Sequence, residues 1–199
     1  MIEFLRPTLI SVFFAVWSFG FVFPAHAMET TAKNAFLIDA STGTILMEKD
    51  ADVATAPASM SKIMLLYMLF ERLAEGNLTM DDTFAVSEKA WRMGGSKMFV
   101  GVNTRVSISD LLRGVIVQSG NDASIVIAEG LGGTELNFSA EMTARGAELG
   151  LTNSVFKNAT GWPKEGHVMS ARDIGILSLR LINDFPQFYP IFAETSFTY

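Results

Sequence analysis

The sequence contains no cysteine and only two histidines, which limits the chemistry available to its side chains. Without cysteine there is no disulfide, no thiol nucleophile and no cysteine-ligated metal site. Basic residues are also in the minority, with 15 Lys and Arg against 21 Asp and Glu, and the formal net charge is −6. A nucleic-acid partner requires a basic face, so we expect no nucleic acid among the partners of this chain.

One long apolar run is present, at residues 9–23. Arg6 precedes the run, and Pro24 followed by Ala25-His26-Ala27 ends it. A charged head, an apolar middle and a small-x-small site are typical of a secretory signal peptide. The alternative is an uncleaved membrane anchor, but the run is shorter than the roughly 20 residues that span a bilayer. We therefore predict a signal peptide over residues 1–27 and an exported mature chain over residues 28–199.

Removal of the signal peptide takes His26 with it and leaves His167 as the single histidine of the mature chain. A Ser-His-Asp triad or a histidine-rich metal site would have to be built around that residue alone. We expect a structural role for His167, and we expect neither a metal nor a cofactor. The length fits one domain with a hydrophobic core of its own.

The apolar pattern predicts a hairpin followed by five helices. Residues 36–39 and 44–47 flank a turn with a glycine, which is typical of paired strands. The segment Met60–Leu73 is apolar nearly all round, which is typical of a buried helix. The other four predicted helices are 110–117 after Ser109, 122–131, 136–149 before Gly150, and 171–182 after Ser170. We therefore expect a mixed α/β chain of the α+β type.

The first candidate for chemistry is Ser59-Met60-Ser61-Lys62, placed in the first turn of the buried helix. Residues three apart share a helix face, so the Ser59 hydroxyl and the Lys62 amine should be neighbours. A serine becomes a nucleophile when a base takes its proton, and burial can lower the pKa of a lysine enough to make it that base. The pattern alone has little specificity, since about one Ser-x-x-Lys occurs by chance in such a length. A second copy, Ser154-Val155-Phe156-Lys157, leads into a turn-like sequence, and we interpret it as structural.

The second candidate is Ser119-Gly120-Asn121, which lies between two apolar helical segments. These residue types are common in ordinary interhelical turns, and taken alone the motif favours that interpretation. Beside Ser59 and Lys62, however, Ser119 could relay a proton to a leaving amine. The Asn121 amide could hold a substrate carbonyl.

The motifs resemble those of a known family. Pro57–Lys62 is similar to the Ser-x-x-Lys motif of serine penicillin-recognising enzymes. Ser119–Ala123 resembles their Ser-x-Asn motif, in the form found in low-molecular-mass D-alanyl-D-alanine carboxypeptidases of peptidase family S11. Segments around residues 35–43, 95–99 and 158–173 resemble that family in the same order. The resemblance implies the transpeptidase fold of penicillin-binding proteins and β-lactamases, an antiparallel sheet packed against a helical cluster.

The resemblance also implies a function. The family removes the terminal D-alanine of peptidoglycan stem peptides through an acyl-enzyme in the periplasm or cell envelope, and β-lactams inhibit it covalently. By that resemblance Ser59 is the nucleophile, Lys62 the proton acceptor, Ser119 the proton relay and Asn121 a substrate-binding residue. The partners implied are peptidoglycan stem peptides and β-lactams.

The family's third motif, Lys-Thr-Gly, does not occur in the sequence, and the nearest string is Lys164-Glu165-Gly166. We interpret the chain as truncated at its C-terminus before that motif. Truncation would remove a lysine that binds the substrate carboxylate and half of the oxyanion hole, and it would leave the N-terminal hairpin with an open edge. Membrane-surface association would then depend on a C-terminal segment that is absent here.

Three other functions stay open. A class A β-lactamase shares the first motif and needs a deacylating glutamate, and Thr134–Asn137 resembles that loop but follows Asn121 too closely. A D,D-endopeptidase of the same family would cut cross-links instead of stem termini. A non-catalytic peptidoglycan-binding fragment would bind muropeptides without being acylated.

Overall fold

The computed structural model describes residues 29–199. The predicted signal peptide over residues 1–27 lies outside the described residues. All helices and strands of the described part belong to one unit, which runs from Ala32 to Tyr199.

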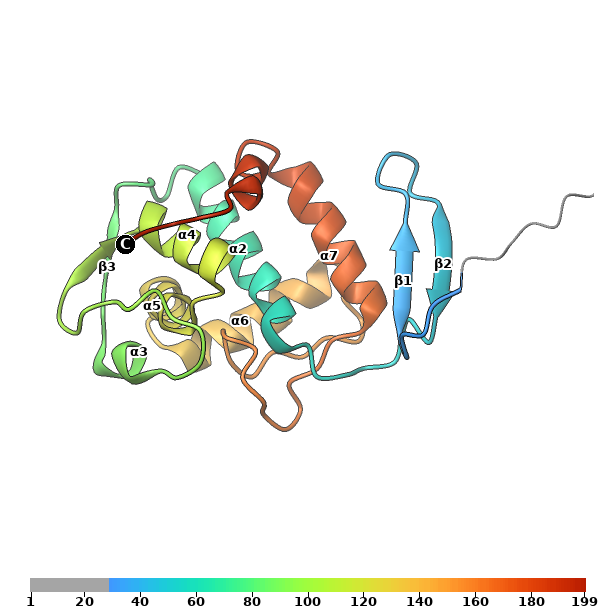
Figure 1. Cartoon of the computed structure of the whole chain (residues 1–199), viewed down its shortest axis with the longest axis horizontal. Helices are drawn as coiled ribbons and strands as arrows, with labels where there is room; N and C mark the ends of the chain where they lie inside the picture. The colour runs from blue at the N-terminus through green and yellow to red at the C-terminus, as the bar shows by residue number, and fades with distance from the viewer. Residues whose placement is uncertain (1–28) are drawn as a thin grey trace, which may run out of the picture. The chain divides into compact units, whose positions relative to one another are not determined.

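The predicted hairpin is confirmed. Strand β1 (Ala35–Ile38) pairs antiparallel with β2 (Ile45–Lys49), and the turn between them takes φ +73° at Gly43. β1 lies against helix α7 (Ala171–Asp184), as Figure 1 shows. No third strand pairs with this hairpin among residues 29–199, so the predicted open edge is present in the described part of the chain.

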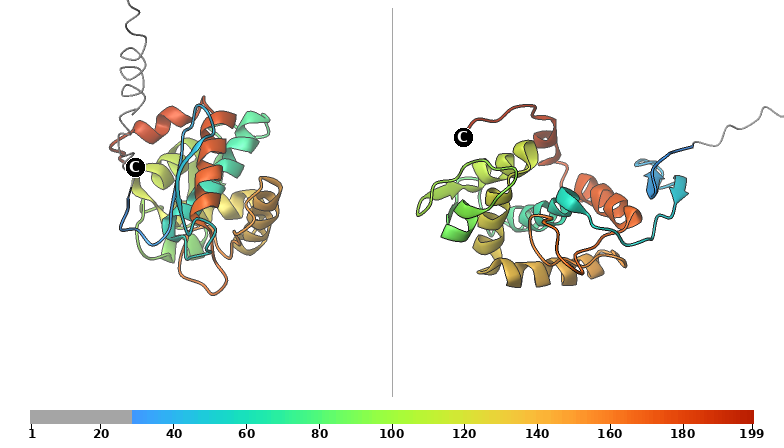
Figure 2. Two further views of the ribbon diagram at one scale, coloured as in Figure 1. Left: turned by 90° about the vertical axis from the view of Figure 1, so that its right-hand side faces the viewer. Right: turned by 60° about the horizontal axis from the view of Figure 1, so that its bottom comes forward.

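The buried helix is α2 (Lys62–Ala74), and it forms the centre of the helical cluster. Eight of its 13 residues are buried, which agrees with the apolar sequence. Helices α5 (Asn121–Gly132), α6 (Glu135–Glu148) and α7 pack against it (Figure 2). Each fully buried Leu, Met or Phe of such a core stabilises the fold by about 1.5–3 kcal/mol.

The start of the buried helix differs from the prediction. Ser59 does not lie in the first turn of α2, because the 3-10 turn η1 (Ala58–Ser61) precedes the helix. A 3-10 turn has three residues per turn, so side chains three apart eclipse one another. Ser59 and Lys62 are therefore still neighbours, as predicted, although Ser59 lies in the 3-10 turn.

The remaining predicted helices are present with shifted ends. Helix α4 (Ile108–Gln118) begins two residues earlier than predicted and is capped by Ser107, whose Oγ accepts from the N–H of Asp110. Helix α7 follows Ser170 as predicted, and Ser170 Oγ caps it by accepting from the N–H of Asp173. Gly150, with φ +89°, follows α6 as predicted.

A short helix and a second small sheet were not predicted from the sequence. These elements are α3 (Glu88–Arg92) and the antiparallel pair β3 (Thr83–Ala85) and β4 (Arg105–Ser107). Strands of three residues are too short for a recognisable alternation. Together with the hairpin and the helical cluster, they confirm the expected α+β class.

The last described residues pack on the same core through aromatic side chains. The short 3-10 helix η2 (Tyr189–Ala193) follows α7, and Phe188 stacks on Phe70 of α2 with 4.8 Å between ring centroids. Arg113 of α4 pairs with Glu194 at 2.9 Å. The segment after α7 thus packs on both α2 and α4.

Candidate active site

The predicted serine and lysine meet where η1 runs into α2. Lys62 Nζ lies 3.1 Å from Ser59 Oγ, within hydrogen-bond distance. Ser59 is exposed, whereas Lys62 is only 4% exposed. The hydroxyl is therefore open to a substrate, while the amine beside it is shielded from water.

Two residues of the second motif, Ser119 and Asn121, also contact Lys62. Ser119 ends α4 in the left-handed conformation, with φ +53°, and Asn121 is the first residue of α5. From this turn Ser119 Oγ lies 3.2 Å and Asn121 Oδ1 lies 2.8 Å from Lys62 Nζ. The motif is an interhelical turn, as its composition indicated, and it also faces the lysine. The structure thus brings together all four residues that were predicted for the site.

Burial sets the protonation of the lysine. It lowers the pKa of Lys62 from its ordinary 10.5 to about 8, because the ammonium form loses its hydration. The three oxygens that accept from Nζ are neutral and replace only part of that hydration. At pH 7 roughly one molecule in ten then carries the free amine. A base is therefore available next to Ser59 near neutral pH.

A loop ahead of α4 fixes the orientation of the Asn121 amide. The Asn121 backbone N–H donates to Ser96 O at 2.7 Å, and its Nδ2 donates to Gly94 O at 2.9 Å. Gly95 has φ +77°, and a Cβ on it would stand 2.7 Å from Asn121 Nδ2. A glycine is thus required by both the backbone and the close approach. With Nδ2 held by the loop, Oδ1 faces Lys62.

A turn from Asn158 to Trp162 lies in close contact with η1, the 3-10 turn that contains Ser59. Asn158 Oδ1 accepts from the N–H of Gly161 at 2.8 Å and of Trp162 at 3.1 Å. Gly161 has φ +82°, and a Cβ on it would overlap the carbonyl oxygen of Ala58. Ala58, directly before Ser59, has φ +49°, which is uncommon for a residue with a side chain. The close packing of Gly161 against the Ala58 carbonyl therefore supports the strained backbone that precedes Ser59.

The second Ser-x-x-Lys copy has different surroundings. Ser154 Oγ donates to Asp173 Oδ2 at 2.7 Å, and the Lys157 side chain is exposed. The Lys157 backbone N–H donates to Nδ1 of His167 at 2.9 Å. Burial lowers the pKa of His167, so this ring serves as a neutral acceptor. These contacts agree with the structural interpretation of both the copy and the histidine.

Sequence reasoning missed three residues that shape the site, namely Gly95, Gly161 and Asp122. The two glycines lie in segments that resemble the family, but no local pattern reveals which distant atoms they approach. Asp122 was noted only as part of a motif, and its carboxylate binds the loop that holds Asn121. Lys164-Glu165-Gly166, the string nearest to the third motif, is exposed.

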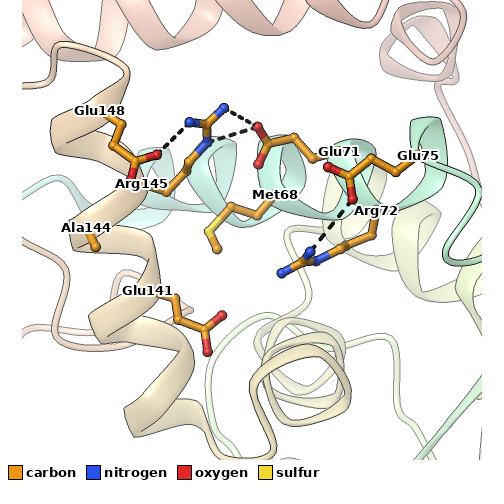
Figure 3. Close-up of a pocket in the computed structure, with 8 residues that line it drawn as sticks. All are labelled: Met68, Glu71, Arg72, Glu75, Glu141, Ala144, Arg145 and Glu148. Atoms are coloured by element: carbon orange, nitrogen blue, oxygen red, sulfur yellow. Dashed lines mark hydrogen bonds and ion pairs between the residues drawn. The ribbon is translucent and has the colours of Figure 1, made fainter.

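Other candidate sites carry less chemistry. Among residues 29–199, no group of three or more His, Asp or Glu could hold a metal ion, and no helix has the length and hydropathy to span a membrane. A groove of about 570 Å³ lies between α2 and α6, lined mainly by paired charges such as Arg145 with Glu71 and Glu148 (Figure 3). Met68, the lining residue of α2 nearest to Lys62 in sequence, is about 9 Å along the helix from it. This groove is therefore separate from the serine–lysine pair.

Comparison with known proteins identifies the family of the chain. A family model described as D-alanyl-D-alanine carboxypeptidase, Peptidase S11, matches residues 22–199. D-alanyl-D-alanine carboxypeptidase DacF of Bacillus subtilis is 41% identical over 151 residues, which cover 76% of this chain and 39% of that protein. DacA of Haemophilus influenzae is 37% identical over 174 residues, which cover 86% of this chain and 44% of that protein. The chain thus spans less than half the length of these relatives.

Solved structures show the same fold. DacD from Francisella tularensis superposes with a TM-score of 0.83 at 37% identity, covering 84% of this chain and 41% of that one. Penicillin binding protein 5 from Haemophilus influenzae gives a TM-score of 0.83 at 36% identity, covering 86% of this chain and 51% of that one. Penicillin-Binding Protein D2 from Listeria monocytogenes, at 24% identity and a TM-score of 0.73, was solved in the ampicillin bound form. The expected penicillin-binding-protein fold is confirmed for the part of the chain that these structures cover.

Proposed function

The chain belongs to the D-alanyl-D-alanine carboxypeptidase family, peptidase family S11, and from that premise we propose that its site performs serine carboxypeptidase chemistry on peptidoglycan stem peptides. The substrate is a peptide ending in D-alanyl-D-alanine, and the product is free D-alanine. We further propose that the chain is exported by a signal peptide over residues 1–27 and acts in the periplasm or cell envelope. The catalytic domain then occupies residues 28–199.

One observation carries the proposal. A buried lysine amine lies within hydrogen-bond distance of an exposed serine hydroxyl, of a second hydroxyl and of an amide oxygen. A nucleophile beside a base with a lowered pKa, and a second proton carrier beside the same base, are the parts that acyl transfer requires.

Acylation begins at Ser59. Its Oγ attacks the carbonyl carbon of the penultimate D-alanine, and its proton passes to the free amine of Lys62. A bond forms between Oγ and the carbonyl carbon, and the oxygen of that carbonyl takes the negative charge. A positioned base of this kind contributes roughly 10²–10⁴-fold to the rate.

Collapse of this intermediate breaks the C–N bond to the terminal D-alanine. The proton held by Lys62 reaches the leaving nitrogen through Ser119, whose Oγ contacts Nζ at 3.2 Å. Asn121 binds the substrate with its amide: Nδ2 has two hydrogens, one bonded to Gly94 O and one left for a substrate carbonyl. Water then hydrolyses the ester on Ser59 and restores the enzyme.

A β-lactam enters the same pathway as a mimic of the dipeptide and leaves Ser59 acylated. We therefore include β-lactams as covalent inhibitors, and we place association with the membrane surface in a C-terminal segment beyond Tyr199. No Lys-Thr-Gly occurs in the 199 residues, so binding of a muropeptide without acylation is the main competing outcome.

The contacts of Glu135 oppose the β-lactamase alternative. Its Oε1 accepts from the N–H of Ala159 at 3.0 Å, and its Oε2 pairs with Lys89 at 2.6 Å. The carboxylate is thus held at Ala159 and Lys89, and among the described residues no hydrogen bond or ion pair joins it to Ser59 or Lys62.

Release of D-alanine tests the proposal. The purified chain is incubated with a pentapeptide muropeptide, and free D-alanine is quantified for the parent, Ser59→Ala and Ser154→Ala. We expect release by the parent and by Ser154→Ala, and none by Ser59→Ala. Equal release by Ser59→Ala would overturn the assignment of the nucleophile. Cleavage of dimeric muropeptides alone would favour the endopeptidase.

A further inference from the structure

A buried carboxylate stands directly after the substrate-binding asparagine. Asp122 is 0% exposed, and both of its oxygens are engaged. Oδ1 accepts from the N–H of Met98 at 3.0 Å, and Oδ2 accepts from the N–H of Phe99 at 2.8 Å and of Val100 at 3.2 Å. Three successive backbone N–H groups around one anion form a nest, a concave arrangement of donors that binds anions.

The loop needs this carboxylate to keep its shape. Phe99 has φ +66°, a left-handed conformation that disfavours bulky residues, and its side chain is 79% exposed. Exposure means that packing contributes little to holding Phe99 in this strained conformation. Hydrogen bonds to a charged acceptor are stronger than neutral ones, and these bonds hold the strained residue in place.

The same loop determines how Asn121 is oriented. A few residues before the nest, Gly94 O and Ser96 O accept from the side chain and backbone of Asn121. If the Asn121 amide were reversed, its NH₂ would face the Lys62 ammonium and the acceptor at 2.8 Å would be lost. The loop therefore selects the rotamer that gives Lys62 its shortest contact.

We propose that Asp122 is a positioning residue for the reaction, which acts by anchoring the 94–100 loop so that Asn121 presents Oδ1 to Lys62 and one N–H to the substrate. This inference rests on the proposed function for its catalytic meaning, while its structural part stands on the contacts alone. Asp122 touches neither Ser59 nor the reacting atoms. It acts through Asn121 and, by way of that amide, through the lysine.

The chain offers a matched control for this carboxylate. Asp173 is also buried, at 1% exposed, also lies in the first turn of a helix, and also accepts from a preceding loop, at Asn153 N and Ser154 Oγ. That loop carries the non-catalytic Ser-x-x-Lys copy. If removal of a buried carboxylate has only a general cost, substitution of either aspartate should have the same effects. If Asp122 positions the site, only substitution of Asp122 should change Lys62 and the acylation rate.

The experiment compares the parent, Asp122→Asn and Asp173→Asn by three measurements. These are the titration of Lys62 followed by NMR of labelled lysine, amide hydrogen exchange at residues 98–100, and the rate of acylation by benzylpenicillin. We expect Asp122→Asn to speed exchange in the loop at least tenfold and to slow acylation by about 10–100-fold, since small misplacements have effects of this size. We expect the Lys62 midpoint to move by half a unit or more, downward if Nζ loses its acceptor and upward if water replaces it. Asp173→Asn should leave all three unchanged.

An unchanged Lys62 titration and an unchanged acylation rate in folded Asp122→Asn would overturn the proposal, as would an equal effect of Asp173→Asn. If the parent itself is not acylated, the proposed function fails, but the titration and the exchange still decide whether Asp122 positions the site. If Asp122→Asn does not fold, all variants are measured in a Phe99→Gly background, because glycine takes the left-handed backbone without strain.

Discussion

The molecule contains the same four-residue pattern twice, and the two copies differ in their surroundings. Ser59 and Lys62 lie at the entrance to a buried helix, with the amine 4% exposed and bonded to three neutral oxygens. Ser154 donates to a carboxylate instead, and the Lys157 side chain is in water. Under the proposed function, burial of the amine and exposure of the hydroxyl, and not the spacing, distinguish the reactive pair from its copy.

Removing each lysine should give the largest contrast between the two copies. Lys62→Met removes the base, and we expect acylation by benzylpenicillin to fall by about 10³-fold or more, while Lys157→Met leaves the rate within twofold. The measurement is the pseudo-first-order acylation rate at pH 8. Equal rates for the parent and Lys62→Met would show that Lys62 is not the base.

Support of the serine turn should give the next largest effect. Gly161→Ala places a Cβ against the Ala58 carbonyl, so we expect acylation to fall about 10²-fold through displacement of Ser59. Gly166→Ala is the control, because Gly166 also has positive φ, at +75°, but a Cβ there would meet only the end of the Lys157 side chain.

The left-handed backbone should cost each glycine variant about 1 kcal/mol of stability. Gly161→Ala should lose more than Gly166→Ala, because its Cβ would also overlap the Ala58 carbonyl. Stability is measured by urea unfolding and acylation by the rate assay. If Gly166→Ala slows acylation as much as Gly161→Ala, the turn from Asn158 to Trp162 has no special role in placing the serine.

Stability should depend on pH through Lys62. Its pKa is about 8 when folded and near the ordinary 10.5 when unfolded, so between these values the unfolded chain binds more protons. Stability then rises with pH from 8 to 10.5, and below pH 8 the buried ammonium destabilises the fold by about 3 kcal/mol. Lys62→Met should therefore be at most about 3 kcal/mol more stable than the parent at pH 7, and this gain should disappear toward pH 10.5.

Urea unfolding of the parent and Lys62→Met at pH 7 and pH 10 tests this pH dependence. Lys157→Met serves as the control, because the Lys157 side chain is exposed. A gain of equal size at both pH values would show that packing by methionine, and not the cost of the buried charge, explains the difference.

The smallest effect should come from the second copy. Ser154→Ala removes a hydrogen bond to the buried Asp173 carboxylate, so we expect a loss of about 1.5–3 kcal/mol in unfolding free energy and no change in acylation. A drop in acylation with unchanged stability would mean that this copy takes part in the reaction.

Much of this contrast could be predicted from the sequence. The apolar character of residues 60–73 indicated a buried lysine, and the turn-like residues after Lys157 favoured a structural role for the second copy. The convergence of Ser119 and Asn121 on Lys62 was inferred from a resemblance, since no periodicity relates positions 57 residues apart.

Contacts between loops could not be predicted. The nest around Asp122 depends on a left-handed Phe99, which no propensity favours, and the Gly161–Ala58 contact joins residues about a hundred positions apart. Such contacts follow from the assembled fold. The start of α2 was misplaced for a related reason, because a 3-10 turn and an α-helical turn have the same apolar pattern over four residues.

The most direct test of Ser59 as the nucleophile is to find which residue carries the acyl group. The purified chain is incubated with benzylpenicillin, its intact mass is measured, and the adduct is mapped by proteolysis and sequencing of the labelled peptide. We expect one penicilloyl group per chain, attached to Ser59 and absent from Lys62→Met. An adduct on Ser154 or Ser119, or no adduct on a chain that circular dichroism shows to be folded, would contradict this expectation.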